Sequence, residues 1–220
     1  MDNFIKLLRS KTKYQLDYWD PDKFNWGSSW VLAEHCSQHF DIWWDPDRFN
    51  WRDSWTLAKY CSEYFNTWWD PSKYNWQSSW TLVEYCSEYF NTWWDPNKFD
   101  WRDSETLAIF CSKYFNTWWD PNKFNWESSW ALAEACSDYF NIWWDPDRFN
   151  YNFIDSINQI GINYLFSNCL EYFDTWFPAI VERKDSLDDE VREIVSYVDL
   201  ALNRPTNESV SQKIRENTSL

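Results

Sequence analysis

Hydrophobic and polar positions recur along this chain with a period of 25 residues. An Asp-Pro pair opens each copy, and no insertion separates the six pairs, which begin at Asp20, Asp45, Asp70, Asp95, Asp120 and Asp145. A fixed period of this length is typical of arrays in which each repeat buries its apolar face against its neighbours. We therefore expect one continuous body and not two domains.

Two elements are predicted in each repeat. Asp followed by Pro is a helix-start signal, because proline lacks an N–H that would be unpaired at that position, but barely more than one turn follows. In the second copy, Leu57, Cys61 and Phe65 recur at i, i+4 and i+8, which predicts an apolar stripe on a helix of about three turns. Strong N-cap residues precede this helix in the five copies, at Ser28, Asp53, Ser78, Asp103 and Ser128.

Each repeat closes on two aromatic residues, such as Trp68-Trp69, before the next Asp-Pro. The residue before proline avoids helical dihedral angles, so we expect the helix to end in a tight loop with buried tryptophan. The preferred fold is a mainly α, right-handed α-solenoid of Trp-rich tandem repeats with terminal caps. If the aromatic pair instead forms a short strand, the alternative is an α/β horseshoe similar to leucine-rich repeats. The motif does not match the tetratricopeptide, ankyrin, armadillo or leucine-rich consensus.

The repeat pattern decays after Asn150 and returns around Cys169, which is typical of a divergent terminal cap. Farther on, Val191 and Val195 belong to the apolar face of an amphipathic helix, which we expect to pack across the last repeat. The predicted segments are an N-terminal cap at 1–19, five repeats at 20–144, a capping repeat at 145–178, the amphipathic helix at 179–204 and a disordered tail at 205–220.

Tryptophan dominates the composition, with 21 residues of 220, and aromatic residues make up 23% of the chain. Such a supply of apolar area can build a core even though the mean hydropathy is −0.74. The slots that begin at Trp26 and at Trp43-Trp44 are aromatic in nearly every copy. We therefore expect these two slots to be buried.

The six cysteines are expected to be free, buried thiols. All but Cys169 share one slot of the repeat, and equivalent residues of stacked helices lie about 8–10 Å apart. A disulfide requires Cα atoms within about 7 Å. Free thiols suit a reducing compartment, so we expect a cytoplasmic protein. Without a C-x-x-C pair, and with only His35 and His39, we predict no zinc site and no cofactor.

The charge narrows the choice of partner. A net charge of −15 disfavours direct binding to nucleic acid or to an anionic membrane surface.

No apolar run is long enough to span a bilayer, and the N-terminus lacks the features of a signal peptide. The chain also lacks a Gly-rich phosphate loop and a nucleophile motif, so we expect that it is not an enzyme.

The candidate binding surface is the slot occupied by Trp30, Trp55, Trp80, Glu105 and Trp130, here named the tryptophan row. A buried, unpaired glutamate is very costly, so the presence of Glu105 predicts that this slot touches solvent. Exposed apolar patches mark interaction sites.

We therefore expect a non-enzymatic acidic scaffold that binds a protein, and a basic one in particular. The alternatives are an acidic nucleic-acid mimic that inhibits a DNA-binding protein, and a carbohydrate platform built on the exposed tryptophans. The sequence leaves the oligomeric state open.

Overall fold

The computed structural model describes residues 19–151, 153–154 and 159–202. Most of the predicted N-terminal cap and the predicted tail lie outside these residues. The chain divides into two compact units, residues 1–125 and 126–220, and each is described here by itself. This boundary falls inside the fifth repeat, where the sequence period is unbroken, so the sequence gives no sign of it.

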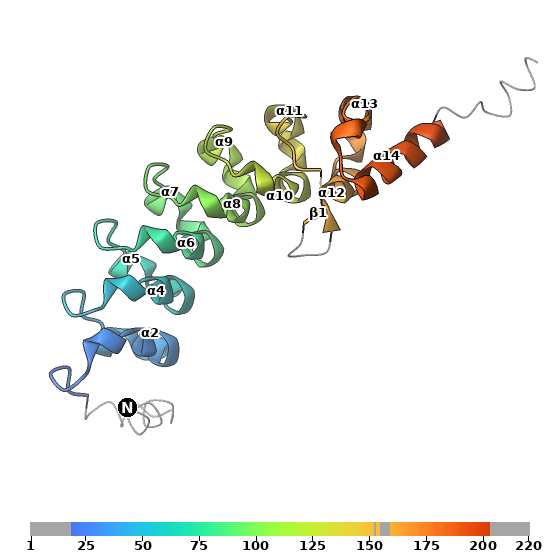
Figure 1. Ribbon diagram of the computed structural model, residues 1–220. Helices are drawn as coiled ribbons and strands as arrows, with labels where there is room; N and C mark the ends of the chain where they lie inside the picture. Colours follow the sequence, from blue (N-terminus) through green and yellow to red (C-terminus); the bar gives the residue numbers. More distant parts are fainter. Residues whose placement is uncertain (1–18, 152, 155–158, 203–220) are drawn as a thin grey trace, which may run out of the picture. The chain divides into compact units, whose positions relative to one another are not determined.

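In the first compact unit, helices follow one another in the order of the repeats (Figure 1). Each repeat contributes one longer helix, and these are α2 (Trp30–Cys36), α4 (Trp55–Tyr60), α6 (Trp80–Tyr85) and α8 (Ser104–Cys111). Each repeat also contributes a single-turn helix, and these are α3 (Phe40–Trp43), α5 (Phe65–Trp68), α7 (Phe90–Trp93) and α9 (Phe115–Trp118). Helix α2 packs against α4, α4 packs against α6 and α6 packs against α8, so these four helices form one layer.

The second compact unit is helical as well. Its helices are α10 (Trp130–Ala135), α11 (Phe140–Trp143), α12 (Gly161–Asn168), α13 (Phe173–Val181) and α14 (Asp189–Leu202). The strands β1 (Phe153–Ile154) and β2 (Gln159–Ile160) pair antiparallel, with Phe153 opposite Ile160. These strands lie beyond the five repeats, and residues 20–144 contain none, so the structure does not support the horseshoe alternative.

The predicted three-turn helix is interrupted in every repeat, and 3-10 turns lie on both sides of the longer helix. The turns before it are Trp26–Ser28, Trp51–Asp53, Trp76–Ser78, Trp101–Asp103 and Trp126–Ser128. The turns after it are Ser37–His39, Ser62–Tyr64, Ser87–Tyr89, Ser112–Tyr114 and Ser137–Tyr139, and two more span Leu170–Tyr172 and Lys184–Ser186. The interruption falls at the cysteine. The Cys61 carbonyl accepts from the backbone N–H of Tyr64 at 3.0 Å and from the indole N–H of Trp68 at 2.8 Å.

The predicted N-caps were wrong in most repeats. The capping side chain lies three residues earlier, where Asn50 accepts from the backbone N–H of Arg52 and starts the 3-10 turn. The longer helix α4 then follows Ser54, whose hydroxyl makes no capping bond. Asp103 does flank α8 at the N-cap position, but it makes no capping bond either. Two polar residues, such as Asp53 and Ser54, stand next to each other before the longer helix, and the sequence does not show which of them occupies the N-cap position.

The predicted short helix after Asp-Pro is a turn. The carboxylate of Asp45 accepts from the backbone N–H of Asp47 at 3.0 Å, and the Asp45 carbonyl accepts from Phe49 at 2.9 Å. The basic residues of these turns make two kinds of contact. Arg48 pairs with Asp45 of its own turn at 3.4 Å, and Lys73 of the next turn lies 5.6 Å from the centre of the Trp51 ring of the preceding repeat.

The core lies between the longer and shorter helices, where Leu57, Cys61, Phe65 and Trp68 are fully buried. The predicted burial of the Trp43 slot is confirmed, whereas its neighbour Trp44 is only half-buried. The prediction for the Trp26 slot was wrong, because every tryptophan in it is half-buried. All six cysteines are buried and free, as expected.

At the C-terminal end, α13 continues through Pro178 to Val181, so the boundary predicted at residue 178 falls inside a helix. As predicted, α14 packs against α13, and it buries Val191 and Val195. None of the helices in the described part of the chain is both long enough and apolar enough to cross a bilayer.

Candidate functional site

Two of the four tryptophan slots in each repeat are fixed by indole hydrogen bonds. In the second repeat, the Trp51 indole N–H donates to the Pro46 carbonyl at 2.9 Å and closes the Asp-Pro turn. The Trp68 indole N–H donates to the Cys61 carbonyl at 2.8 Å and joins the two helices of the repeat. Both slots therefore have a structural role.

A third slot is held by ring stacking. The Trp69 ring stacks on Phe65 with centroids 5.2 Å apart, and Phe65 also stacks on Tyr89 of the next repeat at 4.5 Å. These three rings form a continuous stack across the joint between two repeats. The third slot thus contributes to the contact between repeats.

The tryptophan row differs from the other three slots. Among the described residues, the rings of Trp30, Trp55 and Trp80 make no hydrogen bond and no aromatic contact. Trp30 is 38% exposed, and Trp55 and Trp80 are half-buried. The row therefore presents three large rings whose indole N–H groups donate to none of the described residues.

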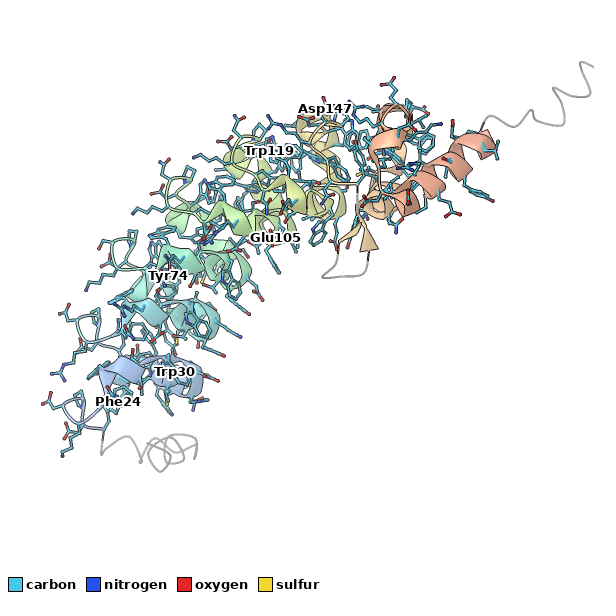
Figure 2. All side chains as sticks on the ribbon, viewed as in Figure 1. Phe24, Trp30, Tyr74, Glu105, Trp119 and Asp147 are labelled. Atoms are coloured by element: carbon cyan, nitrogen blue, oxygen red, sulfur yellow. The ribbon has the colours of Figure 1, made fainter. Side chains whose placement is uncertain are left out.

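The structure brings these three tryptophans together with Glu105, because they lie on four consecutively packed helices of the first compact unit. Figure 2 labels Trp30 and Glu105 on the first and last of these helices. Trp130 belongs to the second compact unit, where its ring packs on Tyr164 of α12 at 5.3 Å. Trp130 therefore has an aromatic partner, and the other row tryptophans have none within residues 19–151, 153–154 and 159–202.

The sequence did not lead us to predict a second aromatic row. Five positions after the tryptophan row, Tyr60 and Tyr85 are half-buried, and Phe110 is 43% exposed. The Lys59 ammonium lies 5.3 Å from the Tyr60 ring and 5.9 Å from the Tyr85 ring. Aromatic residues in three successive copies were the available signal, but His35 and Ala135 at the two ends obscured it.

Carboxylates lie beside both aromatic rows. Glu34 and Glu84 follow Trp30 and Trp80 by four residues, which places each acid on the same helical face as its tryptophan. The Glu84 carboxylate, through a hydrogen bond, raises the pKa of Tyr85. Lys59 occupies the corresponding position of the second repeat. The surface thus combines large aromatic rings with a negative excess.

Glu105 has no cationic partner among the described residues. Its Oε2 atom is buried without a hydrogen-bond partner, and it forms no ion pair within the described chain. The nearby guanidinium of Arg102 is bound instead to Asp100, with an Nε–Oδ1 distance of 2.9 Å. Burial, followed by the negative charges of Asp100 and Glu105, raises the pKa of Asp103. The fold therefore supplies no cation to this carboxylate.

Comparison of the chain with known protein families, characterised proteins and solved structures finds no match. Its function is therefore inferred from the geometry of the tryptophan row. Across the described ranges, no cluster of three His, Cys, Asp or Glu side chains is arranged to hold a metal ion.

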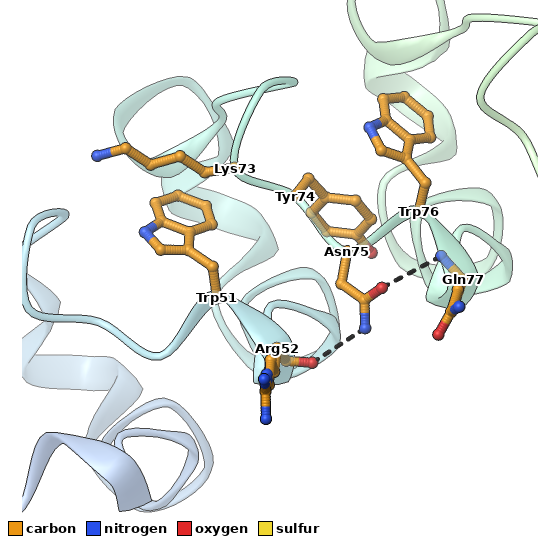
Figure 3. Close-up of a pocket in the computed structure, with 7 residues that line it drawn as sticks. All are labelled: Trp51, Arg52, Lys73, Tyr74, Asn75, Trp76 and Gln77. Carbon is orange, nitrogen blue, oxygen red and sulfur yellow. Dashed lines mark hydrogen bonds between the residues drawn. The ribbon is translucent and has the colours of Figure 1, made fainter.

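A groove lies between the second and third repeats of the first compact unit (Figure 3). Trp51 lies on one side of it under Lys73, whose ammonium also donates to the Pro46 carbonyl at 3.2 Å. At the floor, the Asn75 amide donates to the Arg52 carbonyl at 3.1 Å. Lys73 and Asn75 therefore join the two repeats, and Trp51 and Tyr74 are bonded within their own repeats, so the groove is a weaker candidate for ligand binding than the row.

Proposed function

We propose that this chain is a non-enzymatic acidic scaffold that binds a protein partner through the tryptophan row. The observation that carries the proposal is the contrast among tryptophan slots. Three slots are fixed by hydrogen bonds or ring stacks, whereas Trp30, Trp55 and Trp80 have neither with any residue that the structure describes. Large rings with no such fixed contact, standing at the surface, are suited to anchor another molecule.

The surroundings of the row favour a protein that carries basic groups. Binding energy in protein interfaces concentrates in a few aromatic anchors ringed by polar groups, and truncating one at a hot spot costs about 2 kcal/mol or more. The carboxylates of Glu34 and Glu84 beside these rings add electrostatic complementarity to a basic partner. They are also expected to accelerate its association at low salt.

The test is capture from native lysate with the wild-type chain and with the double variant Trp55→Ala/Trp80→Ala, followed by mass spectrometry. We expect the wild type to capture a specific basic protein, and we expect the double variant to lose it. Thr67→Ala/Thr92→Ala is the matched control, because these exposed residues lie on the shorter helices of the same two repeats. Circular dichroism and urea unfolding should show all three proteins folded. If the double variant unfolds, the row belongs to the core and the proposal is wrong.

The same capture separates the two alternatives. A DNA-binding enzyme that duplex DNA displaces competitively would indicate nucleic-acid mimicry. Binding to a glycan array that is lost in Trp55→Ala/Trp80→Ala would indicate a carbohydrate platform.

We also propose that the 25-residue repeats stack in a right-handed sense, which an experimental structure tests directly. We also propose a cytoplasmic location, supported by six buried cysteines without a disulfide. Thiols trapped at cell lysis should all be alkylated after denaturation, and a disulfide between any two of them would contradict this location.

A further inference from the structure

The fourth repeat reverses the polarity of the face that carries the tryptophan row. Glu105 stands where the other repeats have tryptophan, and Ile109 stands one turn later, where they have glutamate or lysine. Ile109 is 37% exposed and the adjacent Phe110 is 43% exposed. The anchor position therefore carries a carboxylate, and an apolar surface replaces the charge beside it.

The Glu105 carboxylate is prepared for a cation that the fold does not supply. Its buried Oε2 has no donor, and Asp100 and Asp103 add negative charge nearby. Arg102, which is close in sequence, is bound to Asp100. The Glu105 side chain is half-buried, but its Oε2 oxygen is held out of water without a hydrogen bond, which is unfavourable, and a cation from outside the chain removes this cost.

We propose that Glu105 binds the side chain of an arginine in the partner, an inference that rests on the proposed function. The guanidinium donates to the Glu105 carboxylate, and the aliphatic stem packs on Ile109 and Phe110. Arginine suits this position better than lysine, because its planar fork matches a carboxylate and its stem covers apolar surface. One arginine side chain of the partner then contacts both changed positions of the fourth repeat, the Glu105 carboxylate and the apolar Ile109.

The packing of the helices sets the spacing of contacts along the partner. Neighbouring packed helices lie about 8–10 Å apart, and an extended chain advances about 3.3 Å per residue. One repeat therefore corresponds to about three residues of an extended segment. If arginine lies at Glu105, apolar side chains about three and six residues away reach Trp80 and Trp55. The partner segment that fits has two apolar residues and one arginine at this interval.

The experiment uses a phage-displayed library of random dodecapeptides, selected separately on the wild type, on Glu105→Gln and on Trp55→Ala/Trp80→Ala. Peptides from the wild type should be enriched in arginine about three residues from an aromatic or large aliphatic residue. Glu105→Gln should lose the arginine enrichment but keep the apolar one. Glu88→Gln is the matched control, because Glu88 is an exposed acid outside the row, and it should behave as the wild type does.

A synthetic peptide from the wild-type selection then gives the pairwise test by fluorescence anisotropy. Glu105→Gln and replacement of the peptide arginine by citrulline should each weaken binding about tenfold, and the two changes together should cost little more than one alone. Peptides that depend on Trp55 and Trp80 but are indifferent to Glu105 would overturn this inference and leave the proposed function standing. A selection that yields no peptide dependent on Trp55 and Trp80 would contradict both.

Discussion

The hydroxyl oxygen of Ser54 accepts a hydrogen bond of 2.9 Å from the backbone N–H of Asn75, which is 21 residues farther along the chain. Ser54 is fully buried, and the same contact recurs in four other pairs, Ser29–Asn50, Ser79–Asp100, Ser104–Asn125 and Ser129–Asn150. Because the donor is a backbone N–H, the contact tolerates either Asn or Asp at the second position. One serine per repeat thus joins each repeat to the next.

Replacing this serine should destabilise the protein. Ser54→Ala leaves the N–H of Asn75 without its partner in a partly buried position, which costs about 1–3 kcal/mol. Urea unfolding monitored by circular dichroism measures the loss. Ser62→Ala is the control, because Ser62 is half-buried in the same repeat and its hydroxyl makes no hydrogen bond with the described residues. Equal effects of the two substitutions would show that the contact does not stabilise the stack.

The ring stack across the joint should also contribute to stability. Phe65 is stacked between Trp69 and Tyr89, so Tyr89→Leu removes an aromatic pair while keeping much of the apolar area. We expect a loss of about 0.5–1.5 kcal/mol in the free energy of unfolding. Tyr60→Leu is the control, because Tyr60 is also half-buried but has no aromatic stacking partner in the described chain. A larger loss for Tyr60→Leu would contradict the role given to the stack.

Much of this fold could be predicted from the sequence, because the same pattern of apolar and polar positions recurs in every repeat. The 25-residue period, the apolar stripe of Leu57, Cys61 and Phe65, and the free cysteines needed no tertiary information. The Ser54 contact was not predictable, because hydrogen bonds between repeats leave no mark on local pattern and a serine before a helix is also an ordinary cap. The half-burial of Trp51 was missed for a similar reason, since an invariant tryptophan is as compatible with an indole hydrogen bond as with a core position.

The candidate site was partly visible in the sequence. The substitution of tryptophan by Glu105 indicated a slot in contact with solvent, and the structure places all of its members at least partly at the surface. Tyr60, Tyr85 and Phe110 were not identified, because their slot changes from histidine to alanine along the array. Only the packing of one longer helix on the next shows that these residues lie beside one another.

The buried thiols make stability sensitive to alkaline pH. Burial raises the pKa of Cys61 from 9.0 to about 12, and the same holds for Cys86, Cys111, Cys136 and Cys169. Above about pH 9 the unfolded chain loses thiol protons that the folded chain keeps, so the unfolded state binds fewer protons. Stability is therefore intact below pH 9 and falls as pH rises toward 12, by at most about 1.4 kcal/mol per pH unit for each thiol.

Urea unfolding near pH 7.5 and near pH 10 checks this prediction, with Cys86→Ala as a variant whose pH dependence should be weaker. Iodoacetamide should not modify the native protein near pH 8, and it should modify six cysteines in urea. Rapid alkylation of the folded chain would contradict the burial of the thiols.

Replacing Glu105 should stabilise the fold while removing the arginine contact. Two effects oppose each other at this position, because Glu105 lies in the first turn of α8, where a negative charge is favoured by about 0.3–1 kcal/mol. The buried Oε2 without a partner costs about 1–3 kcal/mol, so the unfavourable effect is the larger one.

Glu105→Trp restores the residue found in the other repeats, and we expect it to raise the free energy of unfolding by about 1–2 kcal/mol. Glu105→Gln removes the charge but retains an amide oxygen, so its gain should be smaller, and Glu88→Gln, at an exposed site, should change stability little. Urea unfolding measures all three variants. A less stable Glu105→Trp protein would show that the carboxylate stabilises α8, and the acid would then need no external cation to explain its presence.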